Sequence, residues 1–133
     1  MTDDDPRDEQ ELLAAERLGE PFLLFRNARN RQVLVRLSGD RLTIGRDADM
    51  DVVITWDRDV SRIHAELQRA GSMWLLVDDG LSRNGTWVGD VRVESRRPLR
   101  DGDRIRLGST TITYRAPSEA RASETSVGEI RPL

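Results

Sequence analysis

The stretch QVLVRLSGDRLTI, residues 32–44, decides the fold. It contains two short runs rich in valine, leucine and isoleucine, separated by Ser38, Gly39 and Asp40. Short runs of β-branched and other apolar residues favour strands, and a Ser-Gly-Asp interruption favours a turn. The stretch therefore predicts two consecutive β-strands joined by a short loop.

The same pattern continues on both sides of this stretch. Turn signals such as Asn84-Gly85 separate the apolar runs, and no long helical period follows residue 20. The predicted strands are 22–25, 32–37, 41–44, 51–54, 63–67, 73–77, 86–88, 91–93, 104–107 and 110–114. About ten short strands predict an all-β protein, a sandwich or a barrel.

The 133 residues suffice for one domain with flanking segments. Residues 1–20 hold two arginines against eight carboxylates. Asp5 and Pro6 suit a helix start, so we expect an acidic arm containing at most a short, frayed helix. Residues 21–116 form the predicted domain. Residues 117–133, with two prolines and three serines, are expected to be a disordered tail.

Composition limits the possible functions. The chain has no cysteine, which excludes disulfides and thiolate sites. No apolar run approaches the roughly 20 residues needed to cross a bilayer, so we expect a soluble, cytoplasmic protein. All 21 basic residues are arginine, and residues 21–116 hold seventeen of them against thirteen carboxylates, a net charge of +4. So mild a basic excess, between acidic ends, disfavours nucleic-acid binding.

The usual catalytic groups are poorly represented. The single histidine, His64, follows Ser61 by three positions, which on a strand places the two side chains on opposite faces. One histidine without cysteine does not make the usual zinc site, and Asp47, Asp49 and Asp51 lack the rest of a calcium-loop pattern. We interpret these aspartates as a polar loop and expect no enzyme activity, metal or cofactor.

Six polar residues in the predicted loops remain as candidate ligand-binding groups: Arg46, Ser61, Arg62, Arg83, Asn84 and Thr86. If the loops meet at one end of a sandwich, they offer several guanidiniums and neutral donors to one anion. This combination suits a phosphate dianion. The alternative for each residue is a turn former or a solvated surface charge.

The ordered segments Gly45-Arg46, Ser61-Arg62-Ile63-His64, Asn84-Gly85-Thr86 and 99–108 resemble the signature of the forkhead-associated (FHA) domain. FHA domains are phosphopeptide readers. The resemblance covers residues 22 to 116. It implies a β-sandwich of about eleven strands whose loops at one end bind phosphothreonine in an extended peptide.

The resemblance also assigns roles by position. It implies that Arg46 and Ser61 contact the phosphate and that Asn84 hydrogen-bonds the peptide backbone, with Arg62 and Arg83 flanking the pocket. Gly45, His64 and Gly85 are expected to support the site, and Ile63 to anchor it in the core. One departure is Gly89-Asp90, where the family commonly has Asn-Gly.

These patterns predict a phosphothreonine-binding signalling module whose partners are phosphorylated proteins and a Ser/Thr kinase. Thr125, in the tail after Glu124, is a candidate phosphosite that would bind the same pocket. The alternative function is a structural interaction scaffold that associates without phosphate. Neither hypothesis involves a nucleic acid or a membrane.

Overall fold

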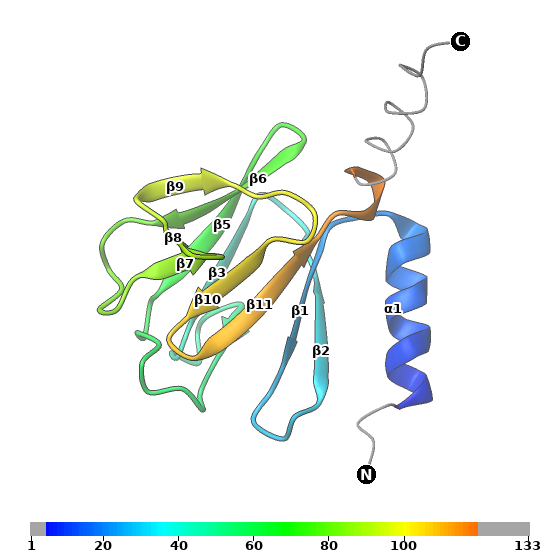
Figure 1. The fold of residues 1–133 in the computed structure, drawn as a ribbon, viewed down its shortest axis with the longest axis horizontal. Helices are drawn as coiled ribbons and strands as arrows, with labels where there is room; N and C mark the ends of the chain where they lie inside the picture. The colour runs from blue at the N-terminus through cyan, green and yellow to red at the C-terminus, as the bar shows by residue number, and fades with distance from the viewer. Residues whose placement is uncertain (1–4, 120–133) are drawn as a thin grey trace.

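The computed structural model of the protein describes residues 5–119, as an N-terminal helix, eleven strands in two facing sheets and a short helical stretch at 117–119 (Figure 1). The helix is α1 (Pro6–Leu18). The strands are β1 (Phe22–Arg26), β2 (Gln32–Arg36), β3 (Arg41–Gly45), β4 (Val52–Val53), β5 (Ala65–Ala70), β6 (Met73–Asp78), β7 (Thr86–Val88), β8 (Val91–Arg92), β9 (Ser95–Pro98), β10 (Arg104–Leu107) and β11 (Thr110–Arg115). The predicted all-β sandwich is confirmed.

The first sheet has six strands in the order β2-β1-β11-β10-β7-β8, and the second has five in the order β4-β3-β5-β6-β9. Neighbouring strands are antiparallel except β3 and β4, which run parallel. Side chains alternate between the core and the outside, as in β10, where Ile105 and Leu107 are fully buried and Arg104 and Arg106 are exposed. This alternation explains why the strand pattern is readable in the sequence.

Strand β9 has no counterpart among the predicted strands. Its sequence, Ser-Arg-Arg-Pro, contains no apolar run, and it pairs with β6 at an edge of the second sheet. Edge strands tolerate charge and proline because one side of the strand needs no ladder partner. The sheet register, rather than local hydrophobicity, makes this segment a strand.

Helix α1 is better formed than a frayed arm. The Asp5 carboxylate accepts a hydrogen bond from the Arg7 backbone N–H, and Gly19 ends the helix in the left-handed conformation. The helix also packs on the domain, where Ala15 is buried and the Gln32 side chain donates to the Asp8 carbonyl. Tertiary contact with β2, absent from any local pattern, accounts for the difference.

Within residues 5–119 no helix is long and apolar enough to cross a membrane. The described chain ends beside the end of α1, because the Ser118 hydroxyl donates to the Gly19 carbonyl at 2.8 Å. Residues 117–119, which the sequence assigned to the disordered tail, are helical, whereas the rest of the predicted tail and the predicted phosphosite Thr125 lie outside the described residues.

Candidate functional site

The three predicted site segments meet at one end of the sandwich. The β3–β5 pairing continues past the strands, because the Arg46 N–H donates to the Ser61 carbonyl at 3.0 Å and the Asp47 N–H donates to the Arg62 carbonyl at 3.1 Å. The loop after β3 and the loop before β5 therefore lie side by side, although fourteen residues separate Arg46 from Val60.

Gly45 makes this close approach possible. A Cβ atom at this position would lie only 2.0 Å from the Arg62 carbonyl oxygen and 3.1 Å from that of Ser61. Both neighbours are backbone atoms, which do not move without displacing the loop. The glycine is thus required by the contact between the two loops.

The third segment joins through Ser61 and Asn84. The Arg83 N–H donates to the Ser61 hydroxyl oxygen at 2.8 Å, and the Asn84 amide donates to the Asp59 carbonyl at 3.0 Å. These bonds hold the β6–β7 loop against the β4–β5 loop. Because the Ser61 oxygen accepts from Arg83, its own proton stays available for another acceptor.

Arg46 is exposed, and one edge of its guanidinium is fixed. Its Nε–H donates to the Val60 carbonyl at 2.5 Å, which leaves the terminal amino groups directed elsewhere. Across residues 5–119 none of the ion pairs involves Arg46, Arg62 or Arg83. An anion at this loop junction would meet guanidiniums that no carboxylate of the described chain neutralises.

His64, buried beneath the junction, connects the segment before β5 with the segment before β7. Its ring is 1% exposed, Nδ1 accepts from the Ser61 backbone N–H at 3.0 Å, and Nε2 lies 2.9 Å from the Gly85 carbonyl. Since a backbone N–H only donates and a carbonyl only accepts, the proton of the neutral ring sits on Nε2. The neutral histidine satisfies both neighbours, whereas an imidazolium would place a second donor against the Ser61 N–H.

This arrangement predicts a pH dependence of stability. Burial lowers the pKa of His64 from its ordinary value of 6.5, although Gly85, Asp78 and Asp57 act in the opposite direction. The unfolded chain therefore takes up a proton near pH 6.5 that the folded protein binds only at lower pH. We expect the free energy of unfolding to be constant above pH 6.5 and to fall as the pH drops through this value.

Urea titrations between pH 8 and pH 5 test this expectation. The lower limit keeps the carboxyls of Asp57 and Asp78, whose pKa values lie below 3.8, out of the measurement. The variant His64→Gln does not titrate in this range and should lack the decline. An equal decline in both proteins would contradict the assignment.

Thr86 requires a correction. The sequence placed it among the ligand-binding residues, but its side chain is fully buried and its hydroxyl donates to the Asp78 carboxylate at 2.7 Å. Thr86 therefore supports the β6–β7 loop from inside the domain. Neighbouring Gly85 has a φ of +85°, and a Cβ there would meet the Arg92 guanidinium at 2.8 Å.

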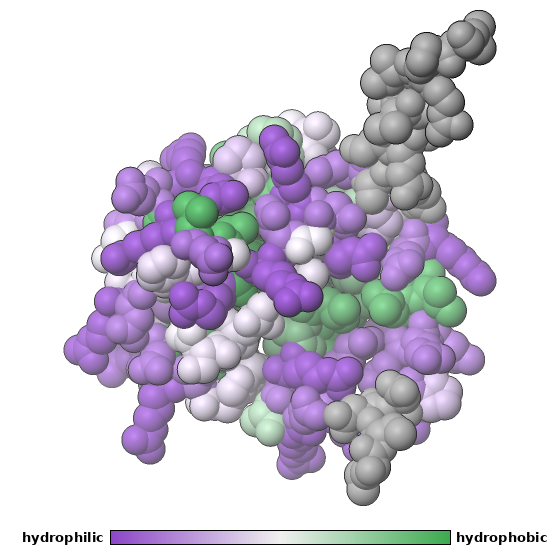
Figure 2. All heavy atoms as spheres, in the orientation of Figure 1, coloured by the Kyte–Doolittle hydropathy of each residue, from purple (hydrophilic) through white to green (hydrophobic). Residues whose placement is uncertain are grey.

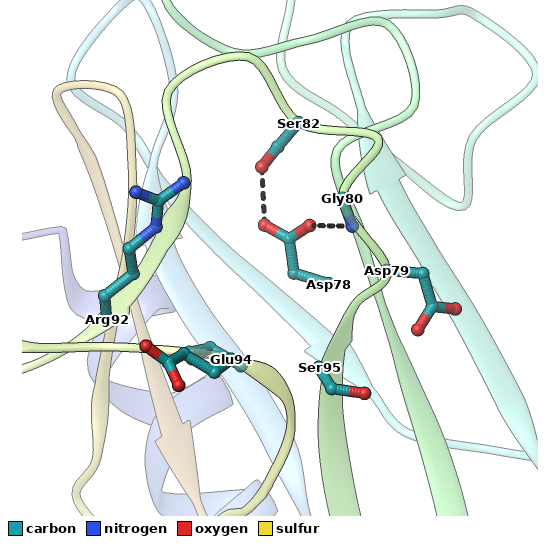
Figure 3. Close-up of a pocket in the computed structure, with 8 residues that line it drawn as sticks. Asp78, Asp79, Gly80, Ser82, Arg92, Glu94 and Ser95 are labelled. Atoms are coloured by element: carbon teal, nitrogen blue, oxygen red, sulfur yellow. Dashed lines mark hydrogen bonds between the residues drawn. The ribbon is translucent and has the colours of Figure 1, made fainter.

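Asp78 organises the loop that carries Arg83 and Asn84. Its carboxylate accepts from the Ser82 hydroxyl and the Gly80 N–H, as Figure 3 shows, and also from the Thr86 hydroxyl. Burial by itself would raise the pKa of Asp78, but these hydrogen bonds outweigh burial and hold the pKa below 3.8. The loop is built around a buried, ionised carboxylate.

A pocket of about 470 Å³ lies beside this loop (Figure 3). Arg92 and Glu94 lie on the side of the pocket opposite Gly80 and Asp79. None of the six predicted ligand-binding residues lines it. The exposed loop junction, rather than this pocket, collects the predicted phosphate-binding groups.

Asp57 is the buried carboxylate that organises the β4–β5 loop, as Asp78 organises the β6–β7 loop. It accepts from the Ser109 N–H and the Thr110 hydroxyl, both at 2.8 Å, and from the Asp59 N–H at 3.0 Å. The sequence interpretation missed both aspartates. An Asp whose carboxylate accepts from the N–H two residues later is a local turn signal. The distant partners, such as Thr110, carry no such signal.

Ile63 also differs from its prediction. It is 50% exposed, because β5 begins only at Ala65 and His64 turns inward in its place. Ile63 and Arg62 therefore form part of the solvent-facing rim beside Ser61, and Ile63 does not anchor the core.

Comparison with known proteins agrees with this architecture. The family model described as the FHA domain matches residues 42–108, which is half of the chain. The chain belongs to the FHA domain family. FHA domains are interaction modules rather than enzymes.

Two curated relatives carry a region similar to this chain. FHA domain-containing protein PS1 of Arabidopsis thaliana is 39% identical over 77 residues, covering 56% of this chain but 5% of its own. The oxoglutarate dehydrogenase inhibitor of Corynebacterium jeikeium is 31% identical over 96 residues, covering 72% of this chain and 65% of its own. The chain thus spans less than two thirds of either relative.

One solved structure is similar to this chain over nearly the whole length of that structure. It comes from a structural and functional analysis of phosphothreonine-dependent FHA domain interactions, is 35% identical, and superposes with a TM-score of 0.62. The match covers 71% of this chain and 94% of that structure.

The departure from the FHA pattern at Gly89-Asp90 lies away from the loop junction. These two residues form the turn between β7 and β8, at the end of β7 opposite Asn84. The five positions from Asn84 to Gly89 correspond to roughly 16 Å of extended chain. The change in this FHA domain therefore does not touch Arg46, Ser61 or Asn84.

The three aspartates of the β3–β4 loop make local hydrogen bonds in this FHA domain. The Asp47 carboxylate accepts from the Asp49 N–H, and the Asp51 carboxylate accepts from the Thr43 N–H and hydroxyl. Among residues 5–119, no group of three or more acidic or histidine side chains is arranged to hold a metal. The polar-loop interpretation accounts for these residues.

Proposed function

We propose that the chain is a binding module that recognises phosphothreonine in partner proteins phosphorylated by a Ser/Thr kinase. The observation that carries the proposal is the junction of Arg46, Ser61 and Asn84 at one end of the sandwich. The backbone contacts of the loops hold all three in place before any ligand arrives. Preorganised donors lose little conformational entropy on binding.

The chemistry of the junction suits a phosphate dianion. Arg46 offers terminal amino groups on a fixed guanidinium, and Ser61 offers a hydroxyl proton. Arg62 and Arg83, both exposed beside them, add positive charge. Asn84 keeps its amide oxygen, and a second amide hydrogen, for the backbone of an extended peptide.

The FHA relatives support the phosphothreonine part of the proposal. The similar solved structure belongs to a study of phosphothreonine-dependent interactions, and it matches the region that carries Arg46, Ser61 and Asn84. We propose a cytoplasmic location, where a Ser/Thr kinase and its substrates are accessible. Neither a cofactor nor a metal enters the proposed interaction.

A peptide library tests the function directly. Degenerate peptides centred on phosphothreonine, on phosphoserine and on unmodified threonine are presented to the full chain, and bound peptides are measured by isothermal titration calorimetry. We expect binding of the phosphothreonine set alone. Partners captured equally well before and after phosphatase treatment would instead support the phosphate-independent scaffold.

We further propose that phosphorylated Thr125 binds the loop junction of a second copy. Strand β11 runs from Thr110, beside Asp57 at the site end, toward Arg115 at the α1 end, a span of roughly 17 Å. The six residues from Glu119 to Thr125 extend at most about 21 Å, which leaves little chain to turn back and enter the junction. Binding between copies has no such length limit.

Sedimentation of the Thr125-phosphorylated chain over a range of concentrations checks this proposal. We expect association that increases with concentration and disappears on Arg46→Ala. A phosphorylated chain that stays monomeric and binds added phosphopeptide as well as the unphosphorylated chain does would contradict it.

A further inference from the structure

The outer face of the six-stranded sheet carries a second group of arginines around a tryptophan. In the sheet register Arg106 of β10 lies opposite Trp87 of β7, and Trp87 lies opposite Arg92 of β8. Residues directly opposite in a sheet project from the same face. Arg104 shares this face because it precedes Arg106 by two positions on β10. We refer to Arg92, Trp87, Arg104 and Arg106 as the Arg-Trp row.

The charges of the row have no acidic partners in the described chain. The Arg106 guanidinium lies 5.0 Å from the centre of the Trp87 ring and also donates to the Gly108 carbonyl. Arg92, Arg104 and Arg106 are exposed, and within residues 5–119 none of the ion pairs includes them. Strand geometry places these positions within roughly 12 Å of one another, close enough for one extended ligand to reach all of them.

The part of the same outer face that lies nearest α1 is used differently. There α1 packs against β2, and Arg115 of β11 pairs with Glu16 of the helix and with Asp101. Hydrophilic and intermediate side chains cover most of the sheet around β10, whereas apolar surface shows toward α1 and in a smaller patch near β8 (Figure 2). Arg115 is thus neutralised within the described chain, and the arginines of the Arg-Trp row are not.

The row is continuous with the loop junction. The Arg92 guanidinium lies over Gly85, so close that a Cβ there would meet Arg92 Nε at 2.8 Å. Gly85 directly follows Asn84, and Trp87 follows Gly85 by two positions on the same face. Three extended residues cover the roughly 10 Å from Asn84 to Trp87. A peptide chain leaving the junction reaches the row after three or four residues.

We propose that the Arg-Trp row binds an acidic segment of the same partner whose phosphothreonine occupies the loop junction. The inference rests on the proposed function, because it takes the junction as the first contact. Carboxylates match the unpaired guanidiniums, and the Trp87 ring offers a flat apolar surface to the methylene groups of glutamate. A peptide fits better than a nucleic acid because the chain is net acidic, at -3, and the row holds one aromatic ring only.

The test uses the full chain and three sets of peptides. The first is a short phosphothreonine peptide with neutral flanks. The second carries in addition a run of glutamates that begins four positions from the phosphothreonine, on the N-terminal side in one peptide and on the C-terminal side in another. The third has glutamine in place of glutamate. Affinities are measured by calorimetry for the wild type, for Arg104→Gln/Arg106→Gln, and for Arg26→Gln/Arg36→Gln, a control with the same change in charge on exposed arginines of β1 and β2.

We expect glutamate on one of the two sides to tighten binding about tenfold relative to glutamine, from two or three modest ion pairs. Arg104→Gln/Arg106→Gln should abolish this gain and leave the short peptide unaffected, while the control double variant should retain the gain. Equal affinities of the glutamate and glutamine peptides, or a gain that survives Arg104→Gln/Arg106→Gln, would overturn the inference.

Two further binding measurements distinguish a failure of this inference from a failure of the proposed function. If no phosphopeptide binds but the unphosphorylated glutamate peptide binds in an Arg106-dependent way, the phosphothreonine function fails and the acidic-segment surface stands. An oligothymidylate of equal charge that binds more tightly than this glutamate peptide, and loses binding in Arg104→Gln/Arg106→Gln, would overturn the choice of a peptide ligand.

Discussion

Replacement of Arg46 by alanine is expected to weaken binding of a phosphothreonine peptide by at least about 30-fold, or about 2 kcal/mol. The guanidinium is the one arginine of the junction that is fixed in place, through its bond to the Val60 carbonyl. Its loss removes a charge-assisted contact with the phosphate that the exposed Arg62 and Arg83 do not replace. Calorimetric titration of one phosphopeptide into both proteins measures the effect.

Two controls accompany this variant. Arg46→Lys keeps the charge but lacks the planar donors needed to hold Val60 and phosphate oxygens together, so we expect an intermediate loss. Arg69→Ala removes an exposed arginine of β5 whose side chain donates to the nearby Gly71 carbonyl, away from the loop junction, and it should bind normally. Unchanged affinity in Arg46→Ala would refute the assignment of the phosphate contact.

Gly45→Ala is expected to be the most damaging single change to the fold of the site. The added methyl group would lie 2.0 Å from the Arg62 carbonyl oxygen, so the β3 and β5 ends must separate. Overpacking of this kind costs roughly 1 to 3 kcal/mol, and more when the obstructing atoms are backbone. Thermal unfolding should show a lowered midpoint, and phosphopeptide affinity should fall because Ser61 and Arg46 move apart.

Gly71→Ala is the matched control for this variant. Gly71 has a φ of +65°, but no heavy atom lies within 4 Å of the position of its Cβ. Alanine there pays only the left-handed backbone strain, roughly 1 to 2 kcal/mol. We expect a smaller loss of stability than in Gly45→Ala and unchanged binding. A Gly45→Ala protein as stable as Gly71→Ala would show that the loops accommodate the methyl group.

The candidate site was partly predictable because its members lie next to sharp local signals. Arg46 follows the end of β3, Ser61 precedes β5, and Asn84-Gly85 forms a turn before β7. The residue types and their order indicate which loops carry the polar groups, and the sandwich then brings those loops to one end. The roles of these residues in binding remain predictions that Arg46→Ala and the peptide library test.

The positions of other residues could not be predicted from local sequence patterns. Thr86 begins a predicted strand and was grouped with the loop residues, yet its side chain is buried, where its hydroxyl donates to the Asp78 carboxylate. Asp57 stabilises the β4–β5 loop through Thr110, which is 53 residues away. Ile63 reads as a core residue but is displaced outward because His64 bonds to Ser61 and Gly85 instead.

The sequence by itself determined the class of fold, the position of most strands and the choice of Arg46, Ser61 and Asn84 as a group. Alternation of apolar residues and turn chemistry are local properties, so they can be read without coordinates. The tertiary structure alone decided which polar groups are buried supports and which face solvent. It also made α1 a docked helix, made 95–98 a strand, and aligned Arg92, Trp87 and Arg106 across three strands. The reason is that burial and cross-strand register depend on partners distant in the chain, and no local window contains those partners.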